Sequence, residues 1–473
     1  MTNQDRSSEN VSQPSRRSIL KAGAATAFLG VGGSGLIAAC TSSSGSKASG
    51  GSSSATATSS ATGAASSAAA PGSKSFAGVT LNVACNPTDI QPAQAAGEAW
   101  AAKTGGKVNA KVIPYAERAT DYATMIVNKD PFYDVLFASS DFVSNFGDRL
   151  YVDLGDINGQ VNGLVPAATK QLTKGGKVYA APLFADMELF IYNKADWTAA
   201  GLDPNQIPGT WEELYAFAPK LNDGKREACV VPWNSIGVNY WKCYYNSFGQ
   251  PMFNEDMTQL MFNNDAGLQT WQAIEQGFKT KWYGQAGSNA AGDADTQLLF
   301  NQNLGASEIN TTGFWAEALS TDPQYKVSIA KTDVGVTTMP GVKSGTSGSI
   351  IVAEGFGINK FSKQQEAALD FILYTITPEF QKKLVLGQAG TSLPPSLLAT
   401  NSDADVVSAY PIAPVLTKQA KSQLTSTGNA PYNWNAPFIL GITNISKGTW
   451  TADQAHAETA KAVQKLIVQY LSS

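Results

Sequence analysis

Alternating and continuous apolar positions predict strands joined by helices at the start of the folded part of the chain. The stretches VTLNVAC (79–85) and KVNAKVIPY (107–115) alternate apolar with polar residues, and YDVLFASSDF (133–142) holds a buried-type apolar run. Between them, AQAAGEAWAAKTGG (93–106) and DYATMIVN (121–128) predict helices, the first ended by glycine. This strand–helix–strand–helix–strand order predicts parallel strands with helices on both faces of the sheet.

The loops after the first and third strands are expected to share one edge of that sheet. In sheets of this kind, ligands bind beyond the carboxyl ends of the strands. The loops Asn86–Ile90 and Ser139–Phe142 each contain a carboxylate, Asp89 and Asp141. An ionised carboxylate accepts strong hydrogen bonds from ligand hydroxyls. Both residues are therefore candidate ligand contacts, the alternative being that they are ordinary surface carboxylates.

The first 40 residues form a segment of a different kind. Two arginines in SRRSILK (15–21) precede a weakly apolar run of Gly, Ala and Ser, and LIAAC (36–40) ends on a cysteine. A charged start followed by a short apolar segment is typical of a targeting signal. SRRSILK resembles the twin-arginine export signal, and LIAAC resembles the lipobox at which a lipoprotein signal peptide is cut. The alternative is an unstructured N-terminus with a chance pair of arginines.

These resemblances imply a signal peptide at 1–39 and a mature chain that begins with a lipid-modified Cys40. Residues 40–75 are almost entirely Ser, Gly, Ala and Thr, and this composition predicts a flexible linker with a mean reach of about 30–35 Å. Each methylene of the lipid buried in the membrane contributes about 0.8 kcal/mol. We therefore expect a protein anchored by lipid to the extracellular face of the cell membrane.

The composition of residues 76–473 limits the classes of partner. A segment of this length is too long for a single core, so two domains are expected. The whole chain has a net charge of −4 and its basic part is the signal segment, which argues against nucleic acid as a partner. The 10 Trp, 16 Tyr and 20 Phe, with many Asn and Gln, suit a neutral polyhydroxy ligand, although most of the aromatic side chains are expected in the core.

Cysteine and histidine usage narrows the chemistry further. Three cysteines follow the lipobox, and Cys229 and Cys243 are the better candidates for a disulfide because they lie close in sequence. Cys85 is then left over as a small buried residue at the end of a strand. The one histidine, His456, lies in an amphipathic C-terminal helix and is expected at the surface. A Ser-His-Asp triad and a histidine-rich metal site are thereby excluded, and we expect no cofactor and no metal.

Several further segments resemble one protein family. The matching pieces are GKVYAAP, FIYNKADW with AGL, PGTWEEL, FNQNLGASEINTTGFW, GVTTMPG, AEGFGINKFSKQQEAALDFILYTITPEFQKKL and GTWTADQAHAETAKAVQKLI. In this order and spacing they are similar to the bacterial extracellular solute-binding proteins of the maltodextrin-binding type, which are receptors of carbohydrate ABC importers. The match covers nearly all of residues 76–473.

The resemblance implies an α/β, two-lobed periplasmic-binding-protein-like fold. Each lobe would hold a central, mostly parallel sheet flanked by helices, with a ligand cleft at the hinge. The chain would cross between lobes near Asp186, Glu354 and Leu398. We therefore expect 76–185 with 355–398 as lobe 1, and 186–354 with 399–473 as lobe 2. Ligand that touches both lobes would favour the closed state, which the membrane permease senses.

The candidate ligand contacts combine carboxylates with aromatic faces. Trp315 falls on the aromatic residue of the family's G-x-W segment, and Trp434 on a second one. The remaining candidates lie near the expected crossings or in an aromatic-rich loop: Asp186, Glu188, Trp233, Tyr240, Trp241, Glu308, Asn310, Thr311 and Glu354. For each aromatic residue, core packing is the alternative.

The predicted function is an extracellular receptor of an ABC transporter that captures a sugar or oligosaccharide and delivers it to the permease. We expect a monomer without catalytic residues; no P-loop and no G-x-S-x-G motif occur. The alternatives are a receptor for another solute, such as a peptide, polyamine or metal, and a secreted glycoside hydrolase, which would need two opposed carboxylates.

Overall fold

The fold is that of a computed structural model, which describes residues 70–472 apart from 255–256, 316–322, 390–391 and 427–433. The predicted signal peptide, Cys40 and most of the predicted linker lie outside the described residues. The chain divides into two units, Met1–Ser67 and Ala68–Ser473, and everything below concerns the second.

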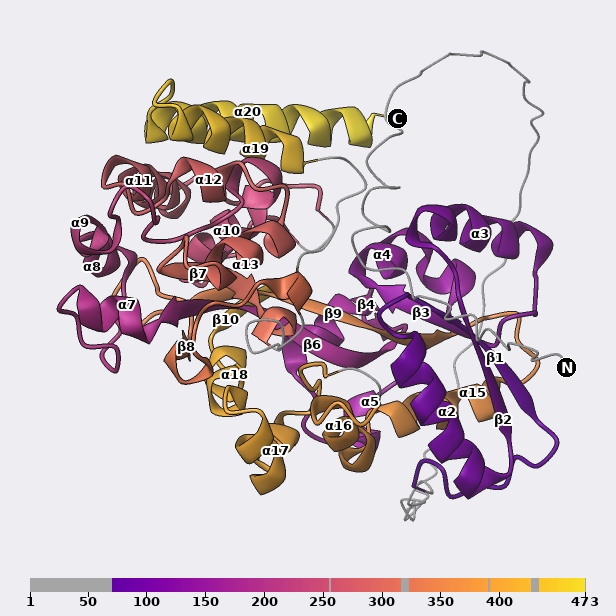
Figure 1. The fold of residues 1–473 in the computed structure, drawn as a ribbon. Helices are drawn as coiled ribbons and strands as arrows, with labels where there is room; N and C mark the ends of the chain where they lie inside the picture. Colours follow the sequence, from indigo (N-terminus) through magenta and orange to yellow (C-terminus); the bar gives the residue numbers. More distant parts are fainter. Residues whose placement is uncertain (1–69, 255–256, 316–322, 390–391, 427–433, 473) are drawn as a thin grey trace, which may run out of the picture. The chain divides into compact units, whose positions relative to one another are not determined.

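The predicted order of strands and helices at the start of this unit is confirmed (Figure 1). Strands β1 (Thr80–Cys85), β2 (Lys107–Val112) and β3 (Val135–Ser139) alternate with helices α2 (Ile90–Thr104) and α3 (Tyr115–Asn128). β1 pairs in parallel with both β2 and β3. As predicted, α2 ends at a glycine, Gly105, whose φ of 75° is a left-handed conformation that glycine adopts without strain.

One mixed sheet runs through the whole unit in the order β2-β1-β3-β9-β6-β7, with β10 paired to β9 and β8 to β6. Its other strands are β6 (Ala181–Asn193), β7 (Ser307–Thr311), β8 (Val334–Thr337), β9 (Gly348–Ile358) and β10 (Gln423–Ser426). The expectation of mostly parallel sheets holds for β1–β3 and for the pair β9–β10, but not for the rest of the sheet. β9 runs antiparallel to β3 and to β6, and β6 runs antiparallel to β7 and β8, because the chain leaves along β6 and returns along β9.

The remaining helices and one small two-stranded β-ribbon, β4–β5, complete the unit. They are α4 (Ser140–Leu150), α5 (Ile157–Gln160), α6 (Pro166–Gln171), β4 (Thr173–Lys174), β5 (Lys177–Val178), α7 (Lys194–Ala199), α8 (Trp211–Tyr215), α9 (Ala218–Leu221), α10 (Trp233–Asn246), α11 (Asp265–Lys279), α12 (Gln285–Ser288), α13 (Asp293–Asn301), α15 (Gln365–Thr375), α16 (Pro378–Val385), α17 (Ala404–Ala409), α18 (Ala413–Ala420), α19 (Asn435–Ser446) and α20 (Ala452–Leu471), with 3-10 turns η1 (Thr312–Phe314), η2 (Pro323–Tyr325), η3 (Lys331–Asp333) and η4 (Leu398–Ser402).

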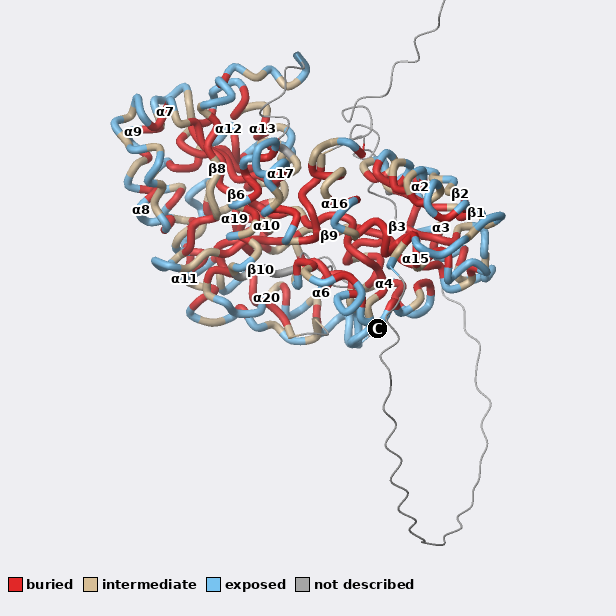
Figure 2. The backbone as a smooth tube through the Cα atoms, turned by 90° about the horizontal axis from the view of Figure 1, so that it is seen from below, coloured by how far each residue is buried: buried red, intermediate tan, exposed pale blue. Residues whose placement is uncertain are grey.

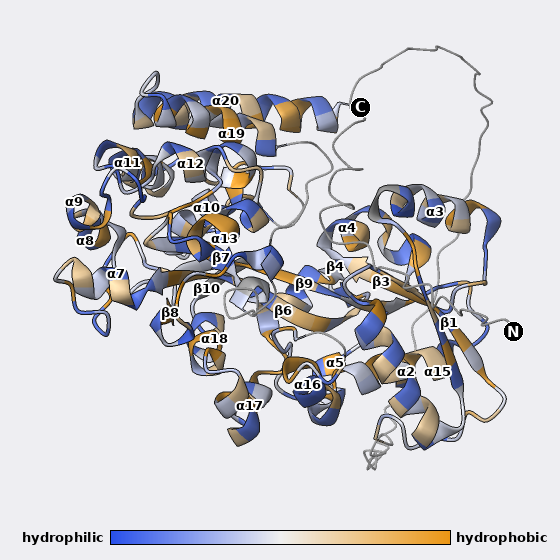
Figure 3. Cartoon of the chain, viewed as in Figure 1, coloured by the Kyte–Doolittle hydropathy of each residue, from blue (hydrophilic) through white to orange (hydrophobic). Residues whose placement is uncertain are grey.

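Two helix starts follow directly from the sequence. Thr210 caps α8 and Glu213 returns the bond to the Thr210 backbone, which is the capping box expected from PGTWEEL. Thr451 and Gln454 form a second capping box at the start of α20. Most buried positions of α20 recur three or four residues apart, and Figure 3 shows polar and apolar residues mixed along the helix. This helix therefore lies with one face against α11 and α19.

The buried side chains fall into clusters drawn from different parts of the chain. One cluster takes its members only from residues 81–184 and 356–397, around β1 and α15. Another takes its members only from residues 190–350 and 434–467 and is dominated by aromatic rings, such as the stacked pair Trp211–Tyr244 with ring centroids 4.3 Å apart. Such rings each bury a large apolar area and contribute most of the packing energy. Figure 2 shows the buried positions running through β3, β9 and β6.

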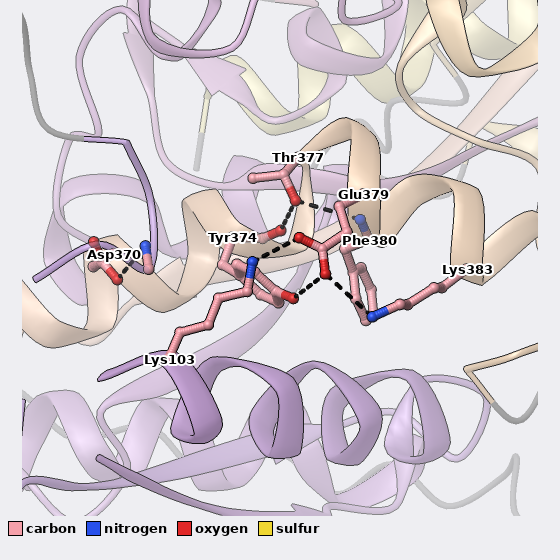
Figure 4. Close-up of polar contacts among 8 residues, drawn as sticks. Lys103, Asp370, Tyr374, Thr377, Glu379, Phe380 and Lys383 are labelled. Carbon is pink, nitrogen blue, oxygen red and sulfur yellow. Dashed lines mark hydrogen bonds and ion pairs between the residues drawn. The ribbon is translucent and has the colours of Figure 1, made fainter. Parts of the chain in front are cut away.

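The end of the predicted linker is held against α2 and α15. The Gly72 N–H and the Trp100 indole N–H both donate to Asp370 Oδ1, at 2.9 and 2.7 Å, and Phe76 stacks on Trp100. Figure 4 shows Asp370 on this surface, beside Glu379, which accepts from Lys103 and Lys383. The chain is thus fixed from Gly72 onward, although the composition predicted a flexible linker up to residue 75.

We predict that Asp370→Ala lowers the melting temperature (Tm), because it leaves the fully buried Trp100 indole N–H without its acceptor. An unsatisfied buried donor costs about 1–3 kcal/mol. Thermal unfolding measures the effect. Glu366→Ala is the control, since its ion pair with Lys74 is solvent-exposed and such pairs contribute about 0–1 kcal/mol. Equal Tm values for the two variants would contradict this prediction.

Candidate functional site

The residues of the central strands β3, β6 and β9 are buried except at a few positions. Every residue of β3 and β6 is buried except Asp186, and every residue of β9 is buried except Val352 and Glu354. The register pairs Asp186 with Val352 and Phe184 with Glu354. Directly paired residues point to the same face of a sheet, and so do residues two apart along a strand. Asp186 and Glu354 therefore share one face, and both are half-exposed on it.

Glu354 has two carboxylates near it, and we call the three residues together the first carboxylate group: Asp89, Asp141 and Glu354. β9 places Glu354 opposite Ser139 at the end of β3, and the Ser139 hydroxyl donates to Asp141. Asn86, directly after β1, donates to Glu354 Oε2 at 3.3 Å. The predicted edge formed by the loops after β1 and β3 is thus a real cluster, completed by a residue 268 positions away from Asn86 along the chain.

A buried arginine supplies positive charge to this first group. Arg118 of α3 is fully buried and donates to Asn86 Oδ1 at 3.2 Å and to the Ile113 carbonyl at 2.7 Å. Its guanidinium lies 4.2 Å from the Phe137 ring centroid. Burial raises the pKa of Asp89 to about 7, although the Thr88 hydroxyl and Arg118 act to lower it. Burial, and next the Asp89 charge, raise the pKa of Glu354 to about 8.

A second carboxylate group lies farther along the same strands: Asp186, Glu188, Asp293 and Glu308. Asp186 and Glu188 come from β6, Glu308 from β7 and Asp293 from the first turn of α13. The Thr312 backbone N–H donates to Asp186 Oδ1 at 2.8 Å, and so does the Thr312 hydroxyl. A glycine stands at 313, where an added Cβ would lie 3.2 Å from Asp186 Oδ2, so the backbone approaches this carboxylate closely.

Polar neighbours connect the members of the second group. The Tyr240 hydroxyl donates to Asp293 Oδ1, and the Asn310 amide donates to Glu308 Oε2 at 3.2 Å and to the Asp293 carbonyl at 3.3 Å. Burial raises the pKa of Asp186 and that of Asp293, the latter to about 6. Burial followed by the charges of Asp293, Asp186 and Glu308 raises the pKa of Glu188 well above its usual range.

The predicted aromatic contacts are all buried. Trp233 and Trp241 are fully buried inside the aromatic cluster, where Trp233 meets Tyr283 edge to face and Trp241 stacks on Tyr245. They belong to the core, which was the alternative, so we leave both out of the site. Trp434 is 3% exposed, packs on Phe253 and Phe438, and has Lys242 Nζ 4.6 Å from its ring centroid.

Trp315 and Tyr240 are also buried, but each adjoins the second group. Trp315 directly follows η1, is 6% exposed, and packs in a cluster with Met187 and Tyr410. Tyr240 is bonded to Asp293 as described above. A ligand at the second group could therefore meet Trp315 only where the ring adjoins η1.

The predicted disulfide is wrong. Cys229, Cys243 and Cys85 are buried free thiols. The backbone of Cys229 forms an isolated β-bridge with Tyr283, whereas Cys243 lies in α10, which packs against β9. The two cysteines are therefore placed in different elements although they are close in sequence. His456, expected at the surface, is half-buried, with Nε2 3.3 Å from the Phe262 carbonyl oxygen.

Sequence reasoning missed three contributors to the site. Arg118 and Asp293 carried no local signal, because a charged residue in a polar helix segment is normally solvated. Asn86 lay inside the loop predicted at the sheet edge, and its position one residue after β1 was a usable signal.

In the described part of the chain, His, Cys, Asp and Glu form no group suited to a metal ion. None of the helices in that part is both long and apolar enough to cross a membrane.

We predict that the ligand-free protein loses stability as pH rises from 5 to 8. Asp89, Asp293 and Glu354 bind protons more tightly folded than unfolded, so the folded state holds more protons in this range and stability falls with pH. Thermal unfolding should show a drop in Tm of about 5 °C or more. Above pH 8 the buried Lys242, whose pKa burial lowers to about 8, acts in the opposite direction.

Glu354→Gln should flatten this slope, because glutamine has no proton to lose. Glu366→Gln on the exposed face of α15 should leave it unchanged. A Tm that stays level or rises between pH 5 and 8 would rule out the buried carboxylates as the cause.

Comparison with known proteins places the chain among relatives. It is 26% identical over 372 residues to a probable ABC transporter-binding protein of Deinococcus radiodurans, covering 74% of this chain and 85% of the relative. It is 24% identical over 270 residues to the mannitol-binding protein of Pseudomonas aeruginosa, covering 54% and 58%. The sugar-binding protein MalE of Xanthomonas citri superposes with a TM-score of 0.71 at 15% identity, covering 83% and 98%.

The structural likeness confirms the predicted two-lobed α/β fold of the periplasmic-binding-protein type. Residues 86–382 match the family model for bacterial extracellular solute-binding proteins. This match spans more than half of the chain, including β3, β6 and β9, and it begins directly after β1. The chain belongs to the family of bacterial extracellular solute-binding proteins.

Proposed function

We propose that the protein is the receptor of an ABC importer, which captures a sugar, oligosaccharide or related polyol outside the cell and delivers it to the membrane permease. The observation that carries the proposal is the half-exposed pair Asp186 and Glu354 on one face of β6 and β9, with a carboxylate group around each. The relatives of this chain include a mannitol-binding and a sugar-binding protein, which supports this class of solute.

The proposed ligand contacts are polar side chains that can bond to hydroxyls. Asp141, Asp186, Asp293 and Glu354 are half-exposed, and a carboxylate oxygen accepts two strong hydrogen bonds. Asp89, Glu188, Glu308 and Asn310 are buried beside them, and the Asn310 amide bonds to the Asp293 carbonyl and to Glu308. Trp315 would add an apolar face at η1.

We also propose how binding is sensed. Asp89 and Asp141 of the first group lie in one half of the chain, around β1 and β3, and the second group lies in the other half, around β7 and α13, while Glu354 lies at the boundary between the halves. A ligand that bonds to both stabilises whichever arrangement brings the halves together, and its binding energy shifts the population toward that arrangement. The halves are proposed as 76–185 with 355–398 and 186–354 with 399–473, the permease as the partner, and a monomer as the working form.

We infer that the carboxylates bind the solute and do not catalyse its hydrolysis. The family is one of solute-binding proteins, and a glycosidase requires one ionised and one protonated carboxyl across a glycosidic bond. Burial raises the pKa values of both Asp89 and Glu354 in the first group and of both Glu188 and Asp293 in the second, so it does not separate an acid from a base within either pair.

A thermal-shift screen against monosaccharides, oligosaccharides and sugar alcohols tests the proposal. A ligand at 100 times its dissociation constant should stabilise the protein by about 2.7 kcal/mol. Asp186→Asn should weaken binding at least about tenfold, and the exposed Glu458→Gln should not. The bound solute should be recovered unchanged. Turnover beyond one equivalent, or no stabilisation by any member of the screen, would refute the proposal.

A second prediction concerns the proposed lipid anchor, which rests on LIAAC and the Ser/Gly/Ala-rich segment after it. Cys40→Ser should release the protein into the medium or block its processing, since the acyl chains would be absent. Fractionation and the mass of the mature N-terminus measure this. Arg16→Lys with Arg17→Lys should stop export. A Cys40→Ser protein that is correctly cut and stays with the membrane would refute the anchor.

A further inference from the structure

The two carboxylate groups differ in the charge that balances them. In the first group, Arg118 lies close enough to act on both Asp89 and Glu354. In the second group, the charges that act on Glu188 are those of Asp293, Asp186 and Glu308, and all are negative. The first group is thus partly neutralised by the protein itself, and the second is not.

Among the described residues, no cation is found among the charges that act on Asp186, Glu188 or Asp293. Tyr240 and Cys243 face it from α10, and Tyr410 faces Asp186 from the end of α17. The lysine on this part of α10, Lys242, directs its ammonium group to the Trp434 ring. The internal segments outside the described residues, 255–256, 316–322, 390–391 and 427–433, contain no lysine or arginine.

One carboxylate oxygen of this group lacks a partner. Glu188 is 1% exposed, and its Oε2 accepts no hydrogen bond within the described residues. A buried charge without a partner is strongly unfavourable, so the free protein keeps this group protonated. Replacing those protons by one positively charged group of a ligand would satisfy several carboxylates at once.

We propose that the solute is an amino sugar, bound with its ammonium group at Asp186 and Asp293 and with its hydroxyls at Asn86 and Glu354. This inference rests on the proposed function and specifies its class of solute. Asp186 and Glu354 occupy diagonal positions on adjacent antiparallel strands, and such positions lie about 7–8 Å apart. One molecule carrying an amine and several hydroxyls can therefore meet both groups.

Other cations fit less well. A polyamine would place a second ammonium beside Arg118, where like charges repel, whereas Asn86, Thr88 and Ser139 offer amide and hydroxyl partners suited to a polyol. A metal ion is disfavoured because the described residues hold no group of ligands arranged for one. An anionic sugar would meet negative charge in the second group and is excluded by repulsion.

The proposal has a consequence that neutral sugars do not share. An ammonium group brought beside Asp186, Asp293 and Glu188 favours their ionised forms, so protons leave the protein as the ligand binds. A neutral sugar exchanges hydrogen bonds and leaves the protons in place. The number of protons released per ligand bound therefore reports whether a cation occupies the second group.

Calorimetric titration of the purified protein at pH 5.5, where Asp293 with its pKa of about 6 is still mostly protonated, measures affinity and, by comparing buffers of different ionisation enthalpy, proton release. The probes are D-glucosamine and its β-1,4 oligomers of two to four units, each compared with its N-acetylated counterpart of the same skeleton and without charge, and glucose oligomers of the same lengths. We expect at least one amine to bind at least about tenfold more tightly than its N-acetylated counterpart, with release of about one proton.

Variants locate the effect. Asp293→Asn should remove most of the preference for the amine over its N-acetylated counterpart and most of the proton release, because both depend on this carboxylate. Asp186→Asn is the second variant, should Asp293→Asn fail to fold as judged by its Tm. The exposed Glu458→Gln removes one negative charge elsewhere and should change neither quantity.

The outcomes separate the inference from the proposed function. Neutral sugars that bind as tightly as the amines, without proton release, would overturn the inference and leave the sugar receptor standing. Binding of spermidine with no binding of any sugar would overturn both, as would the failure of every sugar and amino sugar to bind. A preference for the amine that survives in both variants would also overturn the assignment to the second group.

Discussion

The antiparallel pairing of β6 with β9 is the interaction on which the rest of the structure depends. These two strands are the longest in the sheet and join the parallel part, β1–β3, to the part built on β7 and β8. Their backbone hydrogen bonds fix which residues lie opposite one another, and a slip of one residue would reverse every side chain. The register therefore decides that Asp186 and Glu354 share a face, and it holds both carboxylate groups within reach of one solute.

The cost of this arrangement is electrostatic. Carboxylates buried together without full compensation bind protons more tightly than usual, as the raised pKa values of Asp89, Asp293 and Glu354 indicate. The apolar clusters on both sides supply the stability that offsets it, above all the aromatic cluster around Trp211 and Tyr244. A binding site that is unfavourable when empty is well suited to a receptor, because ligand binding relieves the unfavourable term.

The aromatic residues illustrate how composition can mislead about a site. The abundance of Trp and Tyr was correctly associated with the sugar-binding type of protein, yet Trp233 and Trp241 are core residues. In α10 their rings face α11 and α19, and a ring buried on all sides has no face left for a sugar. The carboxylates Asp186 and Glu354 are placed differently, because they stay half-exposed on otherwise buried strands, where a carboxylate is unfavourable unless it has a role or a partner.

The sequence by itself determined the family, the α/β class, the first three strands with their helices, and the helix cap at Thr210. These depend on local periodicity, capping chemistry and segments in a characteristic order, which are all written along the chain. It could not determine the antiparallel part of the sheet, the free state of Cys229 and Cys243, or the roles of Arg118 and Asp293. Only the tertiary structure decided these, because each depends on residues far apart in sequence that β6 and β9 bring together.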